Sequence, residues 1–369
     1  MKATTIDEYW FWLCNIDGIG SKKADRLIKR FGNPEEIYRA GAKELSLAEG
    51  ITEQDIHNIK ESRKTGILKE KYEYMNRKAI QFIHRESELF PWQLKEMTDC
   101  PYGLFVKGNA KRLTQGETNG MVSVVGARNS SSYGNHIAEQ MGFELAVHGV
   151  TVISGMARGI DASAHWGAVH AKGQTIAVLG CGADICYPRE NINLYEAILE
   201  HGVIISEYPC QTPPTAWQFP MRNRIISGLA DRVVVVEARK ESGSLITVEY
   251  ALQQGKDVMA VPGRIDDKLS EGCNQLIREG AELITGAKDI LDNLSIDGRI
   301  HYCKKFVKKK FMLEKELESV YSYVDLFPKS IQTISDESGK KPEELIGLLI
   351  QLQMLDLIDE PAKNYYSKK

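Results

Sequence analysis

The sequence predicts an α/β fold, in which a parallel sheet covered by helices on both faces lies between a helical domain and a small C-terminal module. Three observations predict it. Residues 1–75 are highly charged and place apolar residues at helical spacing, residues 80–298 alternate short β-branched runs with helical patterns, and residues 311–369 read as three helices and a short β tail. At roughly 150 residues per domain, a chain of 369 residues has room for two or three domains.

The first block contains the segment Ile16-Asp17-Gly18-Ile19-Gly20, which helix formers follow, and a weaker copy at 47–51. Alternation of apolar residues and glycines in this way is typical of a helix–hairpin–helix turn, because glycine lets two helices meet closely. The exposed amides of such a turn can bind a DNA phosphate, and a plain packing turn explains the pattern equally well. The sequence therefore predicts a helix–hairpin–helix, SAM-like domain at residues 1–75.

The middle block predicts seven strands, at 122–125, 150–154, 175–179, 203–205, 233–237, 258–261 and 283–284. Helical patterns separate them near 134–148, 161–171, 192–200, 245–254 and 272–279. The run Arg232-Val-Val-Val-Val-Glu237 is apolar on both faces, as a strand between two helix layers must be. The alternation predicts βαβ units in a parallel sheet.

A basic linker at 299–310 leads to the last block. There, Ser330 is placed to cap a second helix and Pro342 to occupy the first turn of a third. This order suits a winged-helix module at 311–369. Its third helix, running to Met354, contains no basic residue, which makes a poor surface for reading duplex DNA as a transcription factor does. A protein-interaction role is the better hypothesis for this module.

Composition excludes several classes of protein. Hydrophobic residues at 43% and charged residues at 26% exclude a disordered or coiled-coil chain, and a net charge of −3 means that any nucleic acid would be held by a local patch. No apolar run approaches the roughly 20 residues of a membrane helix, and the start resembles no signal or transit peptide. Seven cysteines without a CxxC motif predict reduced thiols in a cytoplasm rather than disulfides or a structural zinc site.

Glycine and arginine recur where the predicted strands end, and in a parallel sheet ligands bind outside the carboxyl ends of the strands. The first strand is followed by Gly126-Ala127-Arg128, the second by Gly155-Met156-Ala157-Arg158, and the fourth predicted helix opens with Ser242-Gly243-Ser244 and Thr247. Arg189 follows a further strand. Close backbone approach, helix amides and guanidinium groups together bind anions, most naturally phosphates.

A third basic cluster, Arg222-Asn223-Arg224, lies just after the aromatic residues Trp217 and Phe219. Arginines beside exposed rings are typical of proteins that bind single-stranded nucleic acid, in which rings stack on bases and cations follow the backbone. On its own, Trp217 is more typical of a core residue than of a base platform.

Other residues here have plainer explanations. Asp161 at a helix start is more typical of an N-cap than of a catalytic acid, and Arg158 could be a buried structural arginine. His165 and His170 are five residues apart and miss the zinc spacing.

The sequence contains none of the common catalytic motifs that we considered. The chain has no G-x-x-x-x-G-K-[ST], G-x-S-x-G or HExxH motif and no close carboxylate pair, and Gly180-Cys181-Gly182 lacks the third glycine of a dinucleotide fingerprint. The loops after the strands are rich in phosphate-binding groups and poor in catalytic ones. The sequence therefore favours a binding function over catalysis, and it predicts no cofactor and no metal.

Taken together, motifs over residues 90–284 closely resemble the DprA/Smf family of bacterial DNA-processing proteins, and they occur in that family's order. They are Phe90-Pro91, Leu104-Phe105-Val106-Lys107-Gly108-Asn109, Val125-Gly126-Ala127-Arg128 with Tyr133-Gly134, Ser154-Gly-Met-Ala-Arg-Gly-Ile-Asp161, Tyr187-Pro188, Ser206-Glu207-Tyr208-Pro209, Phe219-Pro-Met-Arg-Asn-Arg-Ile-Ile226, Ser242-Gly-Ser-Leu-Ile-Thr247, Val261-Pro262-Gly263 and Gly272-Cys-Asn274.

The resemblance implies a cytoplasmic, non-enzymatic protein with an extended Rossmann-like domain that binds single-stranded DNA. Such proteins form homodimers, cover incoming DNA during natural transformation and load a RecA-type recombinase on it. By motif, Arg128 is the best phosphate ligand. The other residues expected at the DNA site are Arg158, Arg189, Arg222, Asn223, Arg224, Gly243, Ser244 and Thr247. Many members carry a basic residue before the strand at 175–179, where this chain has Gln174, with Lys172 as a possible substitute.

A second hypothesis is an enzyme or sensor for a small nucleotide. The segment from Ser242 to Glu249 loosely resembles the P-G-G-x-G-T-x-x-E motif of nucleoside-monophosphate phosphoribohydrolases. Its Thr–Glu spacing is one residue short, and Leu245 and Ile246 replace the glycine region, which makes Glu249 a doubtful catalyst.

Overall fold

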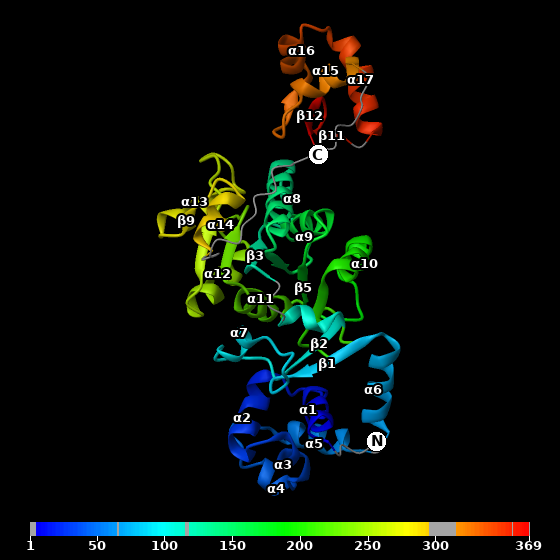
Figure 1. Cartoon of the computed structure of the whole chain (residues 1–369), viewed down its shortest axis with the longest axis vertical. Coiled ribbons are helices and arrows are strands. Elements are labelled where there is room, and N and C mark those ends of the chain that lie inside the picture. The colour runs from blue at the N-terminus through cyan, green and yellow to red at the C-terminus, as the bar shows by residue number, and fades with distance from the viewer. Residues whose placement is uncertain (1–4, 65, 115–117, 295–314, 356, 369) are drawn as a thin grey trace.

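A computed structural model describes residues 5–64, 66–114, 118–294, 315–355 and 357–368 of the chain. Its elements form three parts, an N-terminal group of helices, a central sheet covered by helices, and a C-terminal module (Figure 1). In Figure 1 the N-terminal helices and the C-terminal module lie at opposite ends of the molecule. None of the described helices is both long and apolar enough to span a bilayer.

The N-terminal domain is helical, as predicted. Its helices are α1 (Ile6–Cys14), α2 (Ser21–Phe31), α3 (Pro34–Arg39), α4 (Ala42–Leu45), α5 (Glu53–Ser62) and α6 (Ile67–Arg77). Thr5 caps α1 and Thr52 caps α5, each in a capping box that satisfies amides at the helix start. The predicted hairpin forms the turn between α1 and α2, where Gly18 has φ 80°. That left-handed conformation is the reason for glycine at this position.

The central sheet has nine strands, in the order β1-β2-β6-β5-β4-β3-β7-β8-β9. They are β1 (Ile80–His84), β2 (Gly103–Gly108), β3 (Met121–Val125), β4 (Thr151–Ser154), β5 (Thr175–Leu179), β6 (Val203–Ser206), β7 (Arg232–Val235), β8 (Asp257–Ala260) and β9 (Glu282–Leu283). The strands from β6 through β9 are parallel, whereas β1 pairs antiparallel to β2, and β2 antiparallel to β6. The predicted strands are thus parallel, and the two antiparallel strands at this edge, β1 and β2, were not predicted.

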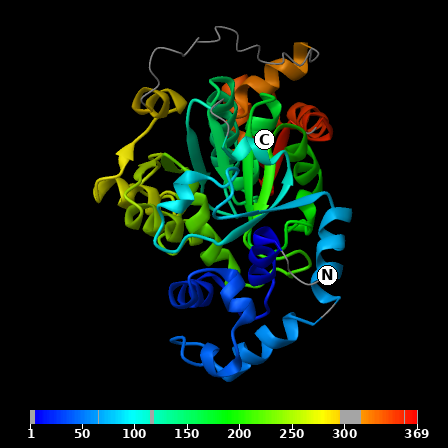
Figure 2. The same ribbon diagram turned by 60° about the horizontal axis from the view of Figure 1, so that its bottom comes forward.

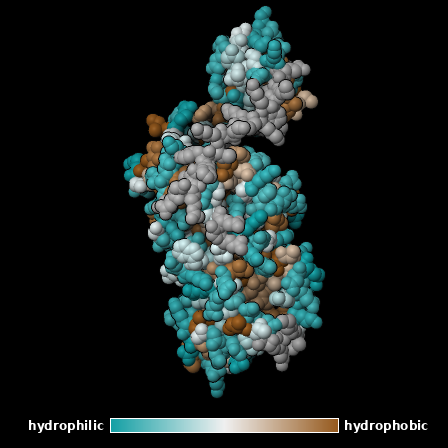
Figure 3. All heavy atoms as spheres, in the orientation of Figure 1, coloured by the Kyte–Doolittle hydropathy of each residue, from teal (hydrophilic) through white to brown (hydrophobic). Residues whose placement is uncertain are grey.

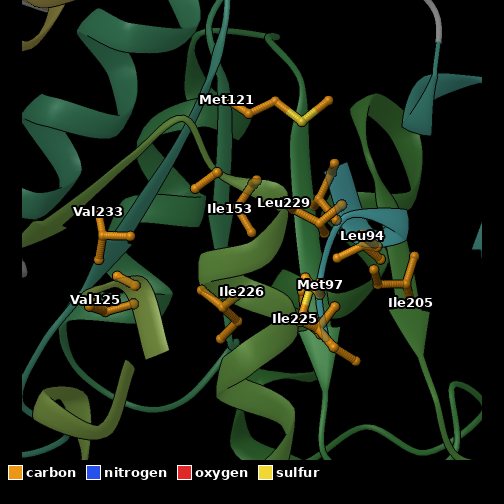
Figure 4. Close-up of a cluster of buried hydrophobic side chains, with 14 of the residues drawn as sticks. Leu94, Met97, Met121, Val125, Ile153, Ile205, Ile225, Ile226, Leu229 and Val233 are labelled. Atoms are coloured by element: carbon orange, nitrogen blue, oxygen red, sulfur yellow. The ribbon is translucent and has the colours of Figure 1, made fainter. Parts of the chain in front are cut away.

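Two layers of helices cover the sheet because its central strands are apolar on both faces. Val122 and Val124 pack with residues of α8 (Ser132–Val147) and α9 (Ile160–His170), and α10 (Ile192–His201) extends this layer. On the opposite face, Val125 packs with residues of α11 (Gln218–Leu229) and α12 (Gly243–Gln253). Figure 4 shows α11 amid this second core, with Ile225, Ile226 and Leu229 beside residues of four strands.

The remaining elements of this domain are short. They are α7 (Trp92–Lys95), α13 (Glu271–Arg278), α14 (Ala287–Asn293) and the 3₁₀ turns at Ala110–Leu113 and Arg189–Asn191. The N-terminal helices and the sheet share one apolar core, in which Trp10 and Phe11 of α1 pack with Ile80, Tyr102 and Phe105 at the β1–β2 edge. Figure 2 shows β1 and β2 between the N-terminal helices and the rest of the sheet. The two domains are thus packed together rather than merely linked.

The C-terminal module contains α15 (Lys315–Tyr323), β10 (Lys329–Ser330), α16 (Ile331–Ser338), α17 (Pro342–Met354), β11 (Ile358–Ala362) and β12 (Tyr365–Lys368). Its strands pair in the order β10-β12-β11. The predicted roles of Ser330 as a cap and of Pro342 in the first helical turn are both confirmed. The predicted basic linker at 299–310 lies outside the described residues.

Candidate nucleic-acid interface

The site follows from the order of the strands. From β3 the chain moves through β4, β5 and β6 toward one edge, and then returns to place β7 on the other side of β3. Loops leaving the carboxyl ends of β3 and β7 therefore diverge, which opens a crevice where α/β sheets bind ligands. A cavity of about 460 Å³ lies there, lined by residues of both loops, including Arg128 and Arg239, and by Ser242 to Ser244 at the start of α12. We call it the switch-point cavity.

A second cavity of about 480 Å³, which we call the aromatic cavity, adjoins the first, and Arg128 lines both. Its walls include Arg158, Tyr187, Arg189 and Phe219. The Phe219 and Tyr187 rings stack with centroids 5.3 Å apart, and the guanidinium carbon of Arg128 lies 5.5 Å from the Phe219 centroid. An aromatic face attracts a cation at this distance, so Phe219 supports Arg128.

Arg128 is exposed, and among the described residues no carboxylate lies within ion-pair distance of it. The predicted residues Asn223, Gly243, Ser244 and Thr247 line the switch-point cavity with it. Asn223 donates a hydrogen bond from Nδ2 to the Gly243 carbonyl, 3.3 Å away, which ties α11 to the start of α12. The structure thus brings together the predicted cation and the predicted helix start.

Arg222 lines both cavities with Arg128, but part of its guanidinium is committed to the backbone. It is buried and donates from Nη1 to the carbonyl oxygens of Gly155 and Val178, at the ends of β4 and β5. Burial lowers the pKa of Arg222 to about 10, against the opposing effect of Asp161. A Cβ at Gly155 would lie 2.4 Å from this guanidinium, which explains the glycine. Arg222 therefore holds the loops together beneath both cavities and adds positive charge from below.

Arg224 does not belong to the pocket. It is fully buried on another side of α11, where Nη2 donates to both carboxylate oxygens of Glu207 and Nε lies 3.1 Å from Asp99. Burial alone would lower the pKa of Arg224, but the two carboxylates outweigh it and hold the pKa above its usual value. The reason is geometric, because residues two apart on a helix point in different directions.

The remaining basic candidates divide between the two ends of the strands. Arg158 and Arg189 line the aromatic cavity and both are exposed. Arg158 is therefore not a buried structural arginine, although Glu190 pairs with it and offsets its charge. Lys172 and Gln174 precede β5, so they lie at the amino ends of the parallel strands, opposite to Arg128. The structure does not bring these two residues to the cavities.

Three further predictions were tested. Asp161 does not cap its helix, since Gly159 is the N-cap, and instead accepts a hydrogen bond from the Gly155 amide, 3.1 Å away. Burial raises the pKa of Asp161. Trp217 is no core residue, because 63% of it is exposed. His165 is buried with Nδ1 2.6 Å from Thr175 Oγ1, and no group of three or more potential metal ligands occurs among the described residues.

Sequence reasoning missed Arg239 and the Tyr187–Phe219 pair. Arg239 follows β7 by four residues and is exposed on the switch-point cavity, so the rule applied to Arg128 would have found it. The Tyr187–Phe219 pair carried no such signal, because its members are 32 positions apart. Glu249, the doubtful catalyst of the second hypothesis, is exposed on α12 and lines neither cavity.

Comparison with known proteins identifies the family of the chain. Residues 81–295 match the family described as DNA recombination-mediator protein A, and residues 13–65 match the SAM-like helix-hairpin-helix tandem. The chain belongs to the DNA recombination-mediator protein A family. Members of this family are DNA-binding recombination mediators, not enzymes.

Similar proteins come from several bacteria. DNA processing protein DprA of Bacillus subtilis is 40% identical over 228 residues, which cover 62% of this chain and 75% of the relative. Protein Smf of Escherichia coli is 37% identical over 279 residues, which cover 74% and 73%. The crystal structure of DprA from Streptococcus pneumoniae matches with a TM-score of 0.67 and 32% identity, over 79% of this chain and 99% of that one.

A structure of DNA processing protein A from Helicobacter pylori, described for its unique single-stranded DNA binding mode, matches with a TM-score of 0.53 and 28% identity. It covers 59% of this chain and 97% of the Helicobacter chain. The predicted family, the α/β fold and the helical domain before it are therefore confirmed.

Proposed function

We propose that this protein binds single-stranded DNA along the two adjoining cavities without cleaving it. The observation that carries the proposal is Arg128, an exposed guanidinium at the wall between the cavities, supported by the Phe219 ring and free of any carboxylate partner among the described residues. A phosphate bound there would also meet the start of α12, whose amides favour negative charge. The Helicobacter relative, which binds single-stranded DNA, supports the assignment.

The aromatic cavity favours a single strand over a duplex. Tyr187 and Phe219 stack on each other and line a concave wall beside Arg128 and Arg189. Bases can approach such rings only when they are unstacked and unpaired, and stacking of this kind depends little on sequence. We therefore expect binding with little sequence preference and with marked sensitivity to salt.

Two buried acidic groups near the cavities, Asp161 and Glu237, have structural tasks, which supports binding without cleavage. Asp161 accepts the Gly155 amide, and Glu237 accepts both the amide and the hydroxyl of Ser131, which fixes the loop after β3. Burial raises the pKa of both carboxyls. A nuclease would instead need ionised carboxylates that face the strand and hold metal.

We further propose that the protein acts in the cytoplasm as a homodimer, covers incoming DNA during natural transformation and loads a RecA-type recombinase on it. Family membership and the DNA-processing role of the relatives support this. The C-terminal module is proposed to be a winged helix, because its order of helix, strand, two helices and two strands suits that fold. Its α17 exposes Ile346, Ile350 and Met354, which favours a protein contact over duplex reading.

The proposal is tested by measuring the affinity for oligothymidylate and for a duplex of equal length across a salt series. The wild-type protein should prefer the single strand, and log affinity should fall with log salt at about −0.7 per neutralised phosphate. Arg128→Ala should weaken binding to all single strands and reduce this slope by about 0.7, whereas Arg264→Ala, which removes an exposed arginine outside both cavities, should do neither. Equal behaviour of the two variants would contradict the site.

The recombinase step has a separate readout. A single strand precoated with single-strand-binding protein should support faster DNA-dependent ATP hydrolysis by a RecA-type recombinase when the wild-type protein is added. An unchanged rate with a protein that binds the strand normally would contradict loading while leaving the DNA site intact.

A further inference from the structure

A third cavity, larger than the two above, lies apart from them between the N-terminal domain and the sheet domain. It measures about 790 Å³, and we call it the interdomain cleft. One wall is the helix–hairpin–helix turn with the start of α2, and the other is the loop after β6 with the start of α11, including Trp217 and Met221. Tyr102 donates a hydrogen bond to Asp25 over 3.0 Å and Arg224 contacts Ser21 over 3.3 Å, so the two walls are held together.

Trp217 is the unusual residue of this cleft. Its side chain lines the cleft, yet 63% of the residue is exposed, and its ring meets Tyr208 edge to face with centroids 6.0 Å apart. Tryptophan offers the largest stacking surface of any side chain, and one left open at the mouth of a cavity marks a surface where a planar apolar group can bind. The fold itself gains little from the exposed part of this ring.

The cleft also offers positive charge. Lys22, at the start of α2, lines it and is exposed, whereas Lys23 is held by Asp55 at 2.6 Å. Of the two carboxylates in the lining, Glu207 is bound to Arg224, and Asp17 lies 3.9 Å from Lys71 Nζ. The uncommitted charge in the cleft is therefore positive, and the groups available suit a base and its phosphate.

The cleft and the proposed DNA site lie on either side of the start of α11. Trp217 precedes this helix and lines the cleft, while Phe219, two residues later, lines the aromatic cavity with Arg128. The N-cap residue and the first turn of α11 thus each place one aromatic ring, Trp217 in the cleft and Phe219 in the aromatic cavity. A strand that leaves Phe219 along this turn arrives at Trp217.

We propose that the interdomain cleft is a second subsite for the same single strand, in which Trp217 stacks on an unpaired base and Lys22 binds the phosphate beside it. The proposal rests on the proposed function and extends it, because it gives the helix–hairpin–helix domain a part in holding DNA. The expected occupant is single-stranded nucleic acid, because a base with an adjoining phosphate offers the planar surface that Trp217 can stack on and the negative charge that Lys22 can bind.

The test is a series of oligothymidylates of increasing length, measured with the full chain by fluorescence anisotropy of an end label. In the wild-type protein, affinity should rise until the strand fills both the cavities and the cleft. Trp217→Ala should leave the shortest bound oligonucleotide unaffected and weaken the longer ones about tenfold, as loss of one stacked base does. Lys22→Glu should show the same length dependence at low salt, and Trp217→Phe should recover part of the loss.

The matched control is Trp92→Ala. Trp92 lies on α7, is 60% exposed and lines none of the three cavities. The Trp92→Ala variant should bind every oligonucleotide as the wild type does. Sedimentation of both tryptophan variants should show an unchanged oligomeric state. The proposal is overturned if Trp217→Ala matches Trp92→Ala at all lengths, or if it weakens the shortest strand as much as the longest. Either result leaves the proposed function standing, whereas failure of the wild type to bind any strand removes both.

Discussion

At the scale of single residues, the neighbours of an arginine decide what it does. Arg128 rests on a ring and faces two cavities, Arg222 is bound to backbone carbonyls beneath them, and Arg224 is neutralised by two carboxylates. The three have the same chemistry, and only the first leaves its donors to a ligand. An arginine contributes to phosphate binding in proportion to the donors that the fold leaves unused.

Two glycines near Arg128 should separate folding from binding. Gly159 has φ 69°, and a Cβ there would lie 2.4 Å from the Ala127 carbonyl oxygen, whereas a Cβ at Gly243 would meet nothing within 4 Å. Gly159→Ala should therefore lower the free energy of unfolding by about 1–3 kcal/mol. Gly243→Ala should change the free energy of unfolding by less than about 0.5 kcal/mol. It should instead lower the affinity for DNA several-fold, because its methyl group would enter the switch-point cavity. Urea unfolding and anisotropy measure the two effects, and a stable Gly159→Ala protein would contradict the packing described.

A buried histidine should make stability depend on pH. Burial lowers the pKa of His165 to about 3, so between that value and the ordinary pKa near 6.5 the unfolded chain binds a proton that the folded chain does not. His165 therefore contributes its full stability above about pH 6.5 and loses it as the pH falls toward 3. At pH 5 the loss should be about 2 kcal/mol. His165→Gln should flatten this part of the stability profile in urea titrations, and an unchanged profile would show that other groups control it.

At the scale of elements, the sequence predicts the parts whose local pattern and tertiary role agree. Strands β3 to β8 are apolar on both faces, and every predicted strand and helix of residues 122–284 overlaps an observed one. Helix α11 was missed because Arg222, Arg224 and Ser227 are buried on it, so its apolar periodicity is interrupted. Strands β1 and β2 were missed because one is half exposed and both belong to an antiparallel edge.

The candidate site divides in the same way. Residues that follow a strand directly, such as Arg128 and Arg158, could be placed from strand ends alone, because parallel strands bring their carboxyl ends together. Residues on α11 could not be placed in this way, because neighbouring side chains on a helix point in different directions. Which of them faces the cavities depends on how packing orients the helix about its axis. Lys172 and Gln174 were expected at the site through the resemblance alone, and the direction of β5 places them at its other end.

Helix α17 permits a prediction about duplex DNA. It runs from Pro342 to Met354 without a basic residue and exposes Ile346, Ile350 and Met354. A helix that contacts the bases or the phosphates of a duplex typically does so through lysine or arginine. Deleting residues 315–369 should therefore change duplex affinity less than about twofold in a gel-shift titration at moderate salt. A loss of tenfold or more would instead assign duplex binding to this module.

At the scale of the whole molecule, β9 forms one of the two edges of the central sheet. Strand β9 has two residues and, within the described part of the chain, pairs only with β8. The loop between β8 and α13 carries Ile265, which is 96% exposed. Figure 3 shows apolar side chains at the corner of the molecule where α13 and the loop before it lie. Single exposed apolar residues are common on monomers, but one this exposed, in the loop that follows β8, suits the proposed homodimer.

In a two-fold interface each copy of Ile265 would be buried by the other chain, because a symmetric dimer uses the same patch twice. Burying one such side chain stabilises by about 1.5–3 kcal/mol, so two copies contribute roughly twice that amount. Ile265→Lys should remove this contribution and also place two like charges together, raising the dimer dissociation constant at least about a hundredfold. Sedimentation at micromolar concentration should then show a monomer for Ile265→Lys and a dimer for Leu47→Lys, which changes an equally apolar residue, 64% exposed, in the N-terminal domain. If both variants sediment alike, Ile265 is not the residue that holds a dimer together.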